Sequence, residues 1–259
     1  MKVVILCGGI GTRLMEETET KPKPMIDIGK KPILWHIMKM YSTYGFNDFV
    51  LAAGYKGEMI KHYFFNYDAI KNDFTIELGK GICEVHKNHS EKGWKVTIVD
   101  TGESALKGCR IKRIERFIDS DIFMLTYGDG LADINLSDLL AFHKKHGKIG
   151  TVTGVRPPSR FGEMIVDMNK VISFTEKPQL SQGMINGGFF VFNRKIFNYL
   201  FSDEKCDFEV GPLEQLAKDG ELMVYEHKGN WTCMDTQRDM IYLNSLWNSN
   251  RAFWKIWDD

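Results

Sequence analysis

The 259-residue sequence has few cysteines, no excess charge of either sign and no long apolar run. Its five cysteines are scattered without a Cys-x-x-Cys pair, so we expect reduced thiols and neither a disulfide framework nor a cysteine metal site. Lysines and arginines number 34, as do aspartates and glutamates, which leaves no basic field to attract nucleic acid or a membrane surface. No segment approaches bilayer-spanning length, and no charged leader opens the chain. These features predict a soluble cytoplasmic protein without nucleic-acid or membrane partners.

The chain opens with a short apolar segment that runs directly into glycines. Residues 2–7 are mostly β-branched and apolar, which is typical of a buried parallel strand. Glycines in the turn Gly8–Arg13 let the backbone approach a ligand closely and leave N–H groups accessible. Turns of this kind hold phosphates at the carboxyl edge of α/β sheets. The pattern therefore predicts nucleotide binding.

Three kinds of glycine loop compete for this turn, besides a purely structural turn. The Walker loop is excluded, because no Gly-Lys-Ser/Thr follows at its spacing. The dinucleotide fingerprint fits only in part, since Leu14 stands where a small residue should allow close helix packing. The third kind ends in a fixed cation, here Arg13, and suits a triphosphate whose outer phosphates leave.

Two lysines follow the glycine turn in the segment Lys21-Pro22-Lys23-Pro24. Each proline fixes its own φ and biases the preceding lysine toward extended backbone. We therefore expect a stiff strap that carries two cations close to a phosphate-shaped turn, which favours the nucleotide interpretation over ordinary surface charge.

Strand-like and helical segments alternate along the chain, which predicts an α/β fold: a Rossmann-like, mostly parallel sheet flanked by helices. A helix is expected over 33–44 with a stop at Gly45, and a buried strand over 48–53. Residues 74–99 are expected to form an inserted β segment at the sheet edge. Further strands are expected in a smaller, mixed sheet of the C-terminal half, at 150–155, 164–167, 171–175 and 187–192. The segment 239–257 reads as an aromatic helix.

The glycine turn and the Lys-Pro strap together resemble the signature of the sugar-1-phosphate nucleotidyltransferases. The continuation 28–41 is similar to their glucose-1-phosphate cytidylyltransferase branch. The likeness extends over nearly the whole chain through Thr126–Gly130, Arg160–Gly162, Glu176–Pro178, Ile185–Phe190 and Met234–Thr236. Cys7 departs from it, because the family more often has alanine there. The resemblance implies the nucleotide-diphospho-sugar transferase fold in one domain, 1–259, with a nucleotide-binding half (about 1–150) and a sugar-phosphate-binding half with C-terminal helices (151–259).

Two aspartates are candidate Mg²⁺ ligands. Asp129 lies between glycines after the buried strand 122–126, at the edge where such folds bind ligands, although an Asp-Gly turn is an equal alternative. Asp235 alone would be a helix N-cap. The resemblance assigns both to the metal-binding pair. Mg²⁺ commonly takes one or two carboxylates and completes its shell with phosphate oxygens and water.

Charge, position and resemblance suggest roles for the other motif residues. Arg13 and Lys23 are expected to stabilise departing pyrophosphate and, with Asp129 and Asp235, to form the catalytic set. Sugar-phosphate contacts are expected from Glu176, Lys177, Asn186 and Gly187. Nucleotide contacts are expected from Leu6, Cys7, Gly8, Gly9, Ile10, Gly11, Thr12, Arg13 and Lys23, and more loosely from Thr101, Ser104 and Arg110.

The resemblance implies transfer of a cytidylyl group from CTP to α-D-glucose 1-phosphate, giving CDP-glucose and pyrophosphate by direct attack at the α-phosphorus. It also implies a homo-oligomer and a place in surface-sugar synthesis. Such transfer requires positioning and charge neutralisation more than a protein nucleophile. A thymidylyl- or uridylyltransferase keeps the same chemistry and stays open. A silent nucleotide-sugar sensor is disfavoured because Arg13, Lys23, Asp129 and Asp235 are all present, and a nicotinamide oxidoreductase because of the Lys-Pro strap.

Overall fold

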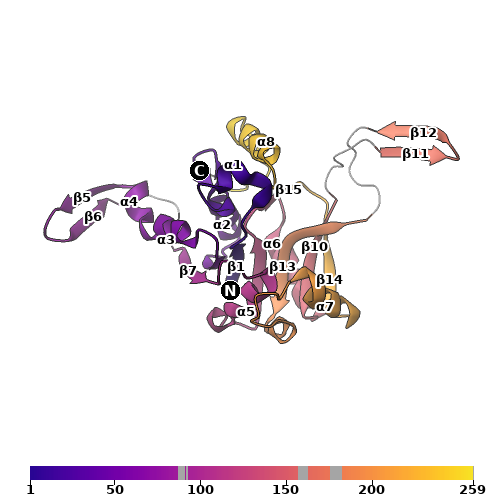
Figure 1. Cartoon of the computed structure of the whole chain (residues 1–259), viewed down its shortest axis with the longest axis horizontal. Coiled ribbons are helices and arrows are strands. Elements are labelled where there is room, and N and C mark those ends of the chain that lie inside the picture. Colours follow the sequence, from indigo (N-terminus) through magenta and orange to yellow (C-terminus); the bar gives the residue numbers. More distant parts are fainter. Residues whose placement is uncertain (87–90, 92, 157–162, 176–182, 259) are drawn as a thin grey trace.

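A seven-stranded sheet forms the centre of the computed structural model, which describes residues 1–86, 91, 93–156, 163–175 and 183–258 (Figure 1). The strand order is β14-β10-β13-β8-β1-β4-β7. Six of its strands run in one direction, and β13 runs against its neighbours β8 and β10. The expected α/β fold with a mostly parallel sheet is confirmed. The strands span Lys2–Cys7 (β1), Asp48–Ala53 (β4), Lys95–Asp100 (β7), Ile122–Tyr127 (β8), Gly150–Val155 (β10), Ile185–Asn193 (β13) and Leu222–His227 (β14).

Both faces of this sheet are covered, which explains the continuous apolar character of its strands. In β1, Val3 and Ile5 pack on one face and Val4 and Leu6 on the other, and all are buried. The first face is covered by α2 (Ile33–Thr43), α3 (Gly57–Phe65) and α6 (Leu136–His146). The second is covered by α5 (Lys107–Arg113), α7 (Glu214–Lys218) and the short 3-10 segment Arg194–Tyr199. No helix in the described part of the chain is long and apolar enough to span a bilayer.

Several shorter elements complete the chain and connect these layers. The helical ones are Thr12–Leu14, α1 (Met15–Thr18), Lys23–Met25, α4 (Tyr67–Lys71) and Glu115–Phe117. The strands are β2 (Asp27–Ile28), β3 (Lys31–Pro32), β9 (Gly130–Ala132) and β15 (Trp231–Cys233). The predictions for α2 and β4 are confirmed: α2 ends before Gly45, whose φ is +79°, and β4 has the expected bounds.

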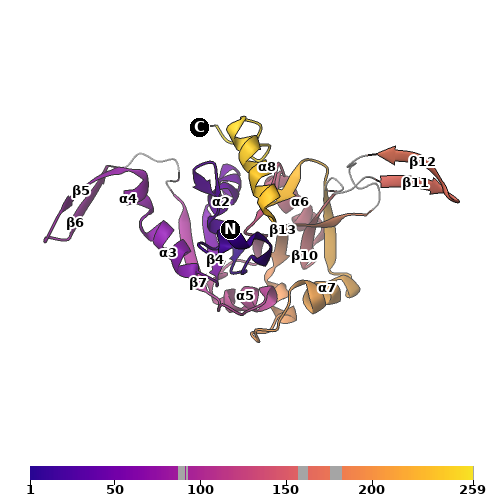
Figure 2. The same ribbon diagram turned by 45° about the horizontal axis from the view of Figure 1, so that its top comes forward.

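Two hairpins project from opposite sides of the body (Figures 1 and 2). One pairs β5 (Asp73–Glu77) with β6 (Ile82–His86), and the other pairs β11 (Glu163–Asp167) with β12 (Lys170–Thr175). The first corrects our expectation for residues 74–99, because only β7 joins the edge of the main sheet. An isolated two-stranded hairpin is marginally stable in water, yet these expose large apolar side chains, Phe74 and Phe174 among them.

The C-terminal half contributes to the main sheet more than expected. We predicted 150–155 and 187–192 in a separate mixed sheet, but β10 and β13 extend the central sheet, and only the hairpin β11–β12 stands apart. The physical reason is burial on both faces: Phe189 and Val191 pack on one side of the sheet and Phe190 and Phe192 on the other. A strand that is apolar on both faces belongs inside a sheet.

The C-terminal helix is shorter than predicted. Helix α8 spans Gln237–Asn248, and Asn250 turns the chain with a φ of +54°. The irregular segment that follows returns to the body and buries Trp254 completely. Trp247, Trp254 and Trp257 surround the imidazole of His36, with ring centroids 4.6, 6.1 and 6.3 Å away. These tryptophans therefore cover the core on the α2 side.

His36 is held in one neutral tautomer within this cluster. Its Nε2 lies 2.9 Å from the Ile28 carbonyl oxygen, which can only accept, and its Nδ1 lies 3.3 Å from Trp254 Nε1, which can only donate. Burial lowers the pKa of His36 to about 4, because a proton on Nδ1 would bury a charge and break the bond from Trp254.

Lowering the pH should therefore destabilise the fold in a way that depends on His36. The unfolded chain takes up this proton near pH 6.5, whereas the folded chain does so near pH 4. The stabilising effect is complete above pH 6.5 and is lost as the pH falls toward 4, by about 3 kcal/mol in total. Urea unfolding of wild type and His36→Gln between pH 7.5 and 5 measures it. We expect the free energy of unfolding to depend less steeply on pH in His36→Gln than in wild type. His62→Gln, at an exposed histidine, is the control and should keep the wild-type slope. Equal slopes in all three proteins would contradict this role of His36.

Candidate active site

A cleft of about 550 Å³ lies at the carboxyl ends of β1 and β8. This is the edge at which α/β sheets bind ligands. Most of the residues singled out from the sequence converge there, although they are far apart in the chain. Those lining the cleft are Leu6, Cys7, Gly8, Gly9, Gly11, Thr12, Arg13, Lys23, Arg110, Asp129, Asn186, Gly187 and Asp235.

The remaining predicted residues fall into two groups. Ile10 and Ser104 are exposed and Thr101 is buried, and none of the three is part of the cleft lining. Glu176 and Lys177, together with the motif 160–162, lie outside the described residues. Their predicted roles stay predictions.

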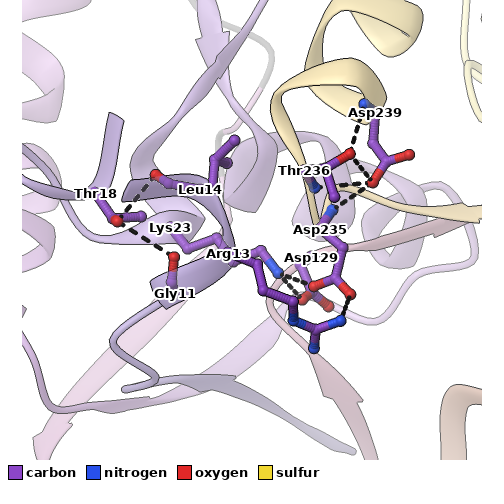
Figure 3. Close-up of polar contacts among 9 residues, drawn as sticks. All are labelled: Gly11, Arg13, Leu14, Thr18, Lys23, Asp129, Asp235, Thr236 and Asp239. Carbon is purple, nitrogen blue, oxygen red and sulfur yellow. Dashed lines mark hydrogen bonds and ion pairs between the residues drawn. The ribbon is translucent and has the colours of Figure 1, made fainter. Parts of the chain in front are cut away.

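Gly8 and Gly11 line the cleft at positions where a side chain would not fit. A Cβ on residue 8 would lie 2.2 Å from Nη1 of Arg110, so only glycine can stand there without displacing that guanidinium. Gly11 has a φ of +71°, and its carbonyl accepts from Leu14 N at 2.9 Å, which starts the next helical turn. The Thr18 hydroxyl donates to the carbonyls of Leu14 and Gly11 at 3.0 and 3.3 Å and fastens the turn (Figure 3).

Arg110 is a buried cation that binds backbone carbonyls instead of a carboxylate. Its guanidinium donates to four of them, on residues 8, 53, 102 and 103, at 2.6–3.3 Å, and to the Thr101 hydroxyl at 2.9 Å. Thr101 in turn donates to the carbonyl of Ala53. These bonds occupy both terminal nitrogens, so Arg110 and Thr101 fasten the glycine turn to the ends of β4 and β7. In this structure both residues position the glycine turn, and their predicted contact with the nucleotide stays a prediction.

A two-stranded ribbon brings the two candidate metal ligands together. β9 and β15 pair antiparallel, with Gly130 opposite Cys233, and Met234 N donates to the Asp129 carbonyl at 2.9 Å. Asp129 directly precedes β9, and Asp235 follows β15 by two residues. Asp129 and Asp235 are 106 residues apart in the sequence, yet this pairing brings both side chains into contact with Lys23.

The N-cap of α8 is Thr236 and not Asp235, which the residue pattern alone would have suggested. Thr236 is the N-cap: its hydroxyl accepts from Asp239 N, and the Asp239 carboxylate accepts from the backbone N–H groups of Asp235 and Thr236 (Figure 3). This capping box satisfies the helix N-terminus without the Asp235 side chain. The Asp235 carboxylate therefore points into the cleft.

Lys23 bridges the two aspartates. Its Nζ lies 2.7 Å from Asp129 Oδ2 and 2.7 Å from Asp235 Oδ1, and Arg13 Nη1 lies 2.5 Å from the other oxygen of Asp235 (Figure 3). The expected extended strap is a short 3-10 turn at Lys23–Met25, which aims Lys23 inward. Lys21 pairs with Asp27 instead, at 2.8 Å, so only one of the two strap lysines enters the cleft.

The charges of this cluster are fixed by its surroundings. Burial lowers the pKa of the Lys23 amine, but the charges of Asp129 and Asp235 and the hydrogen bonds they accept outweigh burial and raise it above its ordinary value. Lys23 is therefore a cation at every working pH. Burial also raises the pKa of the Cys7 thiol, which removes the thiolate a cysteine nucleophile would need.

The cleft is also lined by polar residues that were not among the predicted site residues: Lys107, Tyr127, Glu209 and Trp231. Trp231 Nε1 donates to the Gly187 carbonyl at 2.7 Å, and Tyr127 contacts Asn186. The position of Tyr127, just before Gly128-Asp129, was a usable signal. Glu209 had none, because only the fold brings it beside β8.

A larger cavity, about 990 Å³, lies away from this chemistry, between α3, α4 and β7. Phe64, Tyr67 and Trp94 line it. It contains neither the glycine turn nor the paired aspartates. We therefore place the candidate active site in the smaller cleft.

A family model described as nucleotidyl transferase matches residues 2–255 of the chain. The chain belongs to the nucleotidyl transferase family. Its relatives include enzymes named glucose-1-phosphate cytidylyltransferase from Salmonella typhi and Salmonella typhimurium, each 49% identical over 100% of both chains. The resemblance inferred from the motifs is thus confirmed. The crystal structure of HddC from Yersinia pseudotuberculosis has the same fold as this chain, with a TM-score of 0.70, 23% identity and coverage of 95% of this chain and 99% of that one.

Proposed function

We propose that the chain transfers a cytidylyl group from CTP to α-D-glucose 1-phosphate, releasing pyrophosphate and forming CDP-glucose. The observation that carries this proposal is the full-length identity of 49% to enzymes named for that activity. The cleft supports it, because a glycine turn, two cations and two carboxylates converge at one edge of the sheet.

In the proposed reaction, an oxygen of the sugar phosphate attacks the α-phosphorus of CTP, and pyrophosphate leaves on the opposite side. The protein's task is to position two anions and to offset the charge that develops between them. The glycine turn offers backbone N–H groups to the triphosphate. Arg13, whose side chain is 71% exposed, and Lys23 stabilise the charge that accumulates on pyrophosphate.

We propose that Asp129 and Asp235 hold Mg²⁺. One oxygen of each lies 2.7 Å from the same nitrogen, so the two carboxylates already converge on the position of a cation. Hard carboxylate oxygens suit Mg²⁺, and the described residues contain no cluster of three or more protein ligands that would replace phosphate oxygens and water in its shell. When bound, Mg²⁺ supplies charge neutralisation for the phosphates. Lys23 and Arg13 then become free to bind phosphate oxygens.

Pyrophosphate release tests the proposed function directly. With Mg²⁺ and glucose 1-phosphate, CTP should support faster release than UTP, dTTP, ATP or GTP. Asp129→Asn and Asp235→Asn should each lower turnover by at least about a hundredfold, because each removes charge that the reaction needs. Preference for dTTP or UTP would contradict the assignment of CTP as substrate but would be consistent with nucleotidyl transfer. Failure with all five nucleotides, or full activity of both variants at saturating Mg²⁺, would contradict the proposal.

Lys23 and a divalent cation should compete for the two carboxylates. We expect Lys23→Met to bind Mn²⁺ at least about tenfold more tightly than wild type without nucleotide, since it removes the ammonium held between them. Electron paramagnetic resonance of free Mn²⁺ measures this without turnover. Lys21→Met, which loses the separate ion pair with Asp27, is the matched control and should bind like wild type. Equal Mn²⁺ affinity in Lys23→Met and wild type would refute the competition.

We also propose that the chain forms a homo-oligomer. The two projecting hairpins expose Phe74, Ile76, Ile172 and Phe174 by 48–62%, and a partner would cover them. Sedimentation equilibrium measures the mass. We expect a multiple of 29.8 kDa for wild type and dissociation when all four are replaced by serine; a monomeric wild type would contradict this proposal.

A further inference from the structure

Lys107, Tyr127 and Glu209 form a polar network in the cleft that the proposed reaction does not yet use. Tyr127 ends β8 two residues before Asp129, Lys107 begins α5, and Glu209 begins the kinked helical segment Glu209–Leu213. All three line the cleft beside Asn186, which we predicted to contact the sugar phosphate.

Tyr127 joins Glu209 to Asn186. Its hydroxyl donates to Glu209 Oε1 at 2.6 Å and accepts from Asn186 Nδ2 at 2.9 Å. A carboxylate only accepts and an amide nitrogen only donates, so the direction of both bonds is fixed.

The Asn186 amide is thereby held at both ends. Its Oδ1 accepts from Gly188 N at 2.9 Å, while its Nδ2 donates to Tyr127. The side chain is exposed to the cleft, and an amide can make about four hydrogen bonds. The second N–H of Nδ2 and the second lone pair of Oδ1 of Asn186 are therefore held in fixed directions, as recognition of a hydroxyl requires.

The backbone around Asn186 is shaped to seat the Tyr127 ring. Residues 186 and 190 of β13 pair with 154 and 152 of β10, so β13 carries two additional residues in a bulge. Gly188, inside this bulge, has a φ of +82°, and a Cβ there would lie 2.4 Å from Cδ2 of Tyr127.

Glu209 is anchored on its other side. Lys107 forms an ion pair with Oε1 of Glu209 and lies 5.3 Å from the centre of the Tyr127 ring. The Asp207 carboxylate accepts from Glu209 N at 2.9 Å, which fixes the start of the kinked segment. Oε2 of Glu209 is enclosed without a hydrogen-bond partner among the described residues, an arrangement that stability alone does not favour.

We propose that Tyr127 and Glu209 are positioning residues for the sugar phosphate, and that they act by orienting the Asn186 amide toward sugar hydroxyls. The inference rests on the proposed function, because it assigns the sugar phosphate to this end of the cleft. A site built to hydrogen-bond a hydroxyl discriminates strongly against analogues that misplace it. Tyr127 and Glu209 therefore determine affinity and stereochemical selectivity for the sugar and leave nucleotide binding untouched.

Steady-state kinetics of Tyr127→Phe tests this. We expect the KM for glucose 1-phosphate to rise about tenfold, the size of one lost hydrogen bond in a buried network, with KM for CTP and kcat within about twofold of wild type. The preference in kcat/KM for glucose 1-phosphate over galactose 1-phosphate should fall. Adding Tyr127→Phe to Asn186→Ala should raise this KM no further, because both act through one amide.

Tyr199→Phe is the matched control, since it removes a hydroxyl that donates to Asp219 at 2.8 Å outside the cleft. It should leave both KM values unchanged. If Tyr127→Phe fails to fold, Glu209→Gln makes the same test, with a rise confined to the KM for glucose 1-phosphate. The inference would be overturned, and the proposed function kept, if wild type is active but the Tyr127 and Glu209 variants have unchanged KM values or equal increases in both. Additive effects in the double variant would have the same meaning. A wild type inactive with CTP and glucose 1-phosphate would overturn the proposed function and the inference with it.

Discussion

The Nζ atom of Lys23 holds together the two carboxylates on which the proposed chemistry depends. It joins the N-terminal strap to Asp129 in the middle of the chain and to Asp235 near its end, at 2.7 Å each. Two like charges brought this close repel by about 4 kcal/mol at the effective dielectric of a protein surface. A cation between them removes that repulsion, so Lys23 stabilises the ligand-free cleft and at the same time occupies the position proposed for the metal.

A second cation, Arg110, differs from Lys23 because it binds backbone carbonyls and not carboxylates. It is buried, and its guanidinium donates to carbonyls at the end of β4, in the glycine turn and after β7, which hold it in place. Arg13, by contrast, is largely exposed and has one carboxylate partner. The cleft thus combines a fixed floor, built on Arg110 and the glycine turn, with two cations on the N-terminal segment that are bound only to carboxylates. That division suits a site that must hold a triphosphate and then release pyrophosphate.

The features that depend on local sequence pattern could be predicted from the sequence. Apolar runs predicted β1, β4 and β8, and the spacing of glycines, lysines and Asp129 predicted the edge of the sheet where the cleft lies. The inward turn of Lys23 was not predictable from two adjacent Lys-Pro pairs, because ion pairing with distant aspartates selects one lysine over the other.

Features that depend on long-range pairing were out of reach. From the residue pattern alone, Asp235 would be a helix N-cap, but Thr236 and Asp239 form the cap in the structure. The pairing of β15 with β9 brings Asp235 to Asp129. The apolar residues of β13 indicate burial on both faces, but they do not reveal that β8 and β10 flank it. Glu209 carries no motif, and its place beside Tyr127 follows from the fold alone.

The most direct measurement is a crystal structure of the protein with Mg²⁺ and a non-hydrolysable CTP analogue. We expect a metal ion bound to Asp129 and Asp235, with Lys23 Nζ beyond ion-pair distance of both carboxylates and in contact with phosphate oxygens. A structure in which the nucleotide occupies the cleft while Lys23 still bridges the two aspartates and the metal lies elsewhere would contradict it.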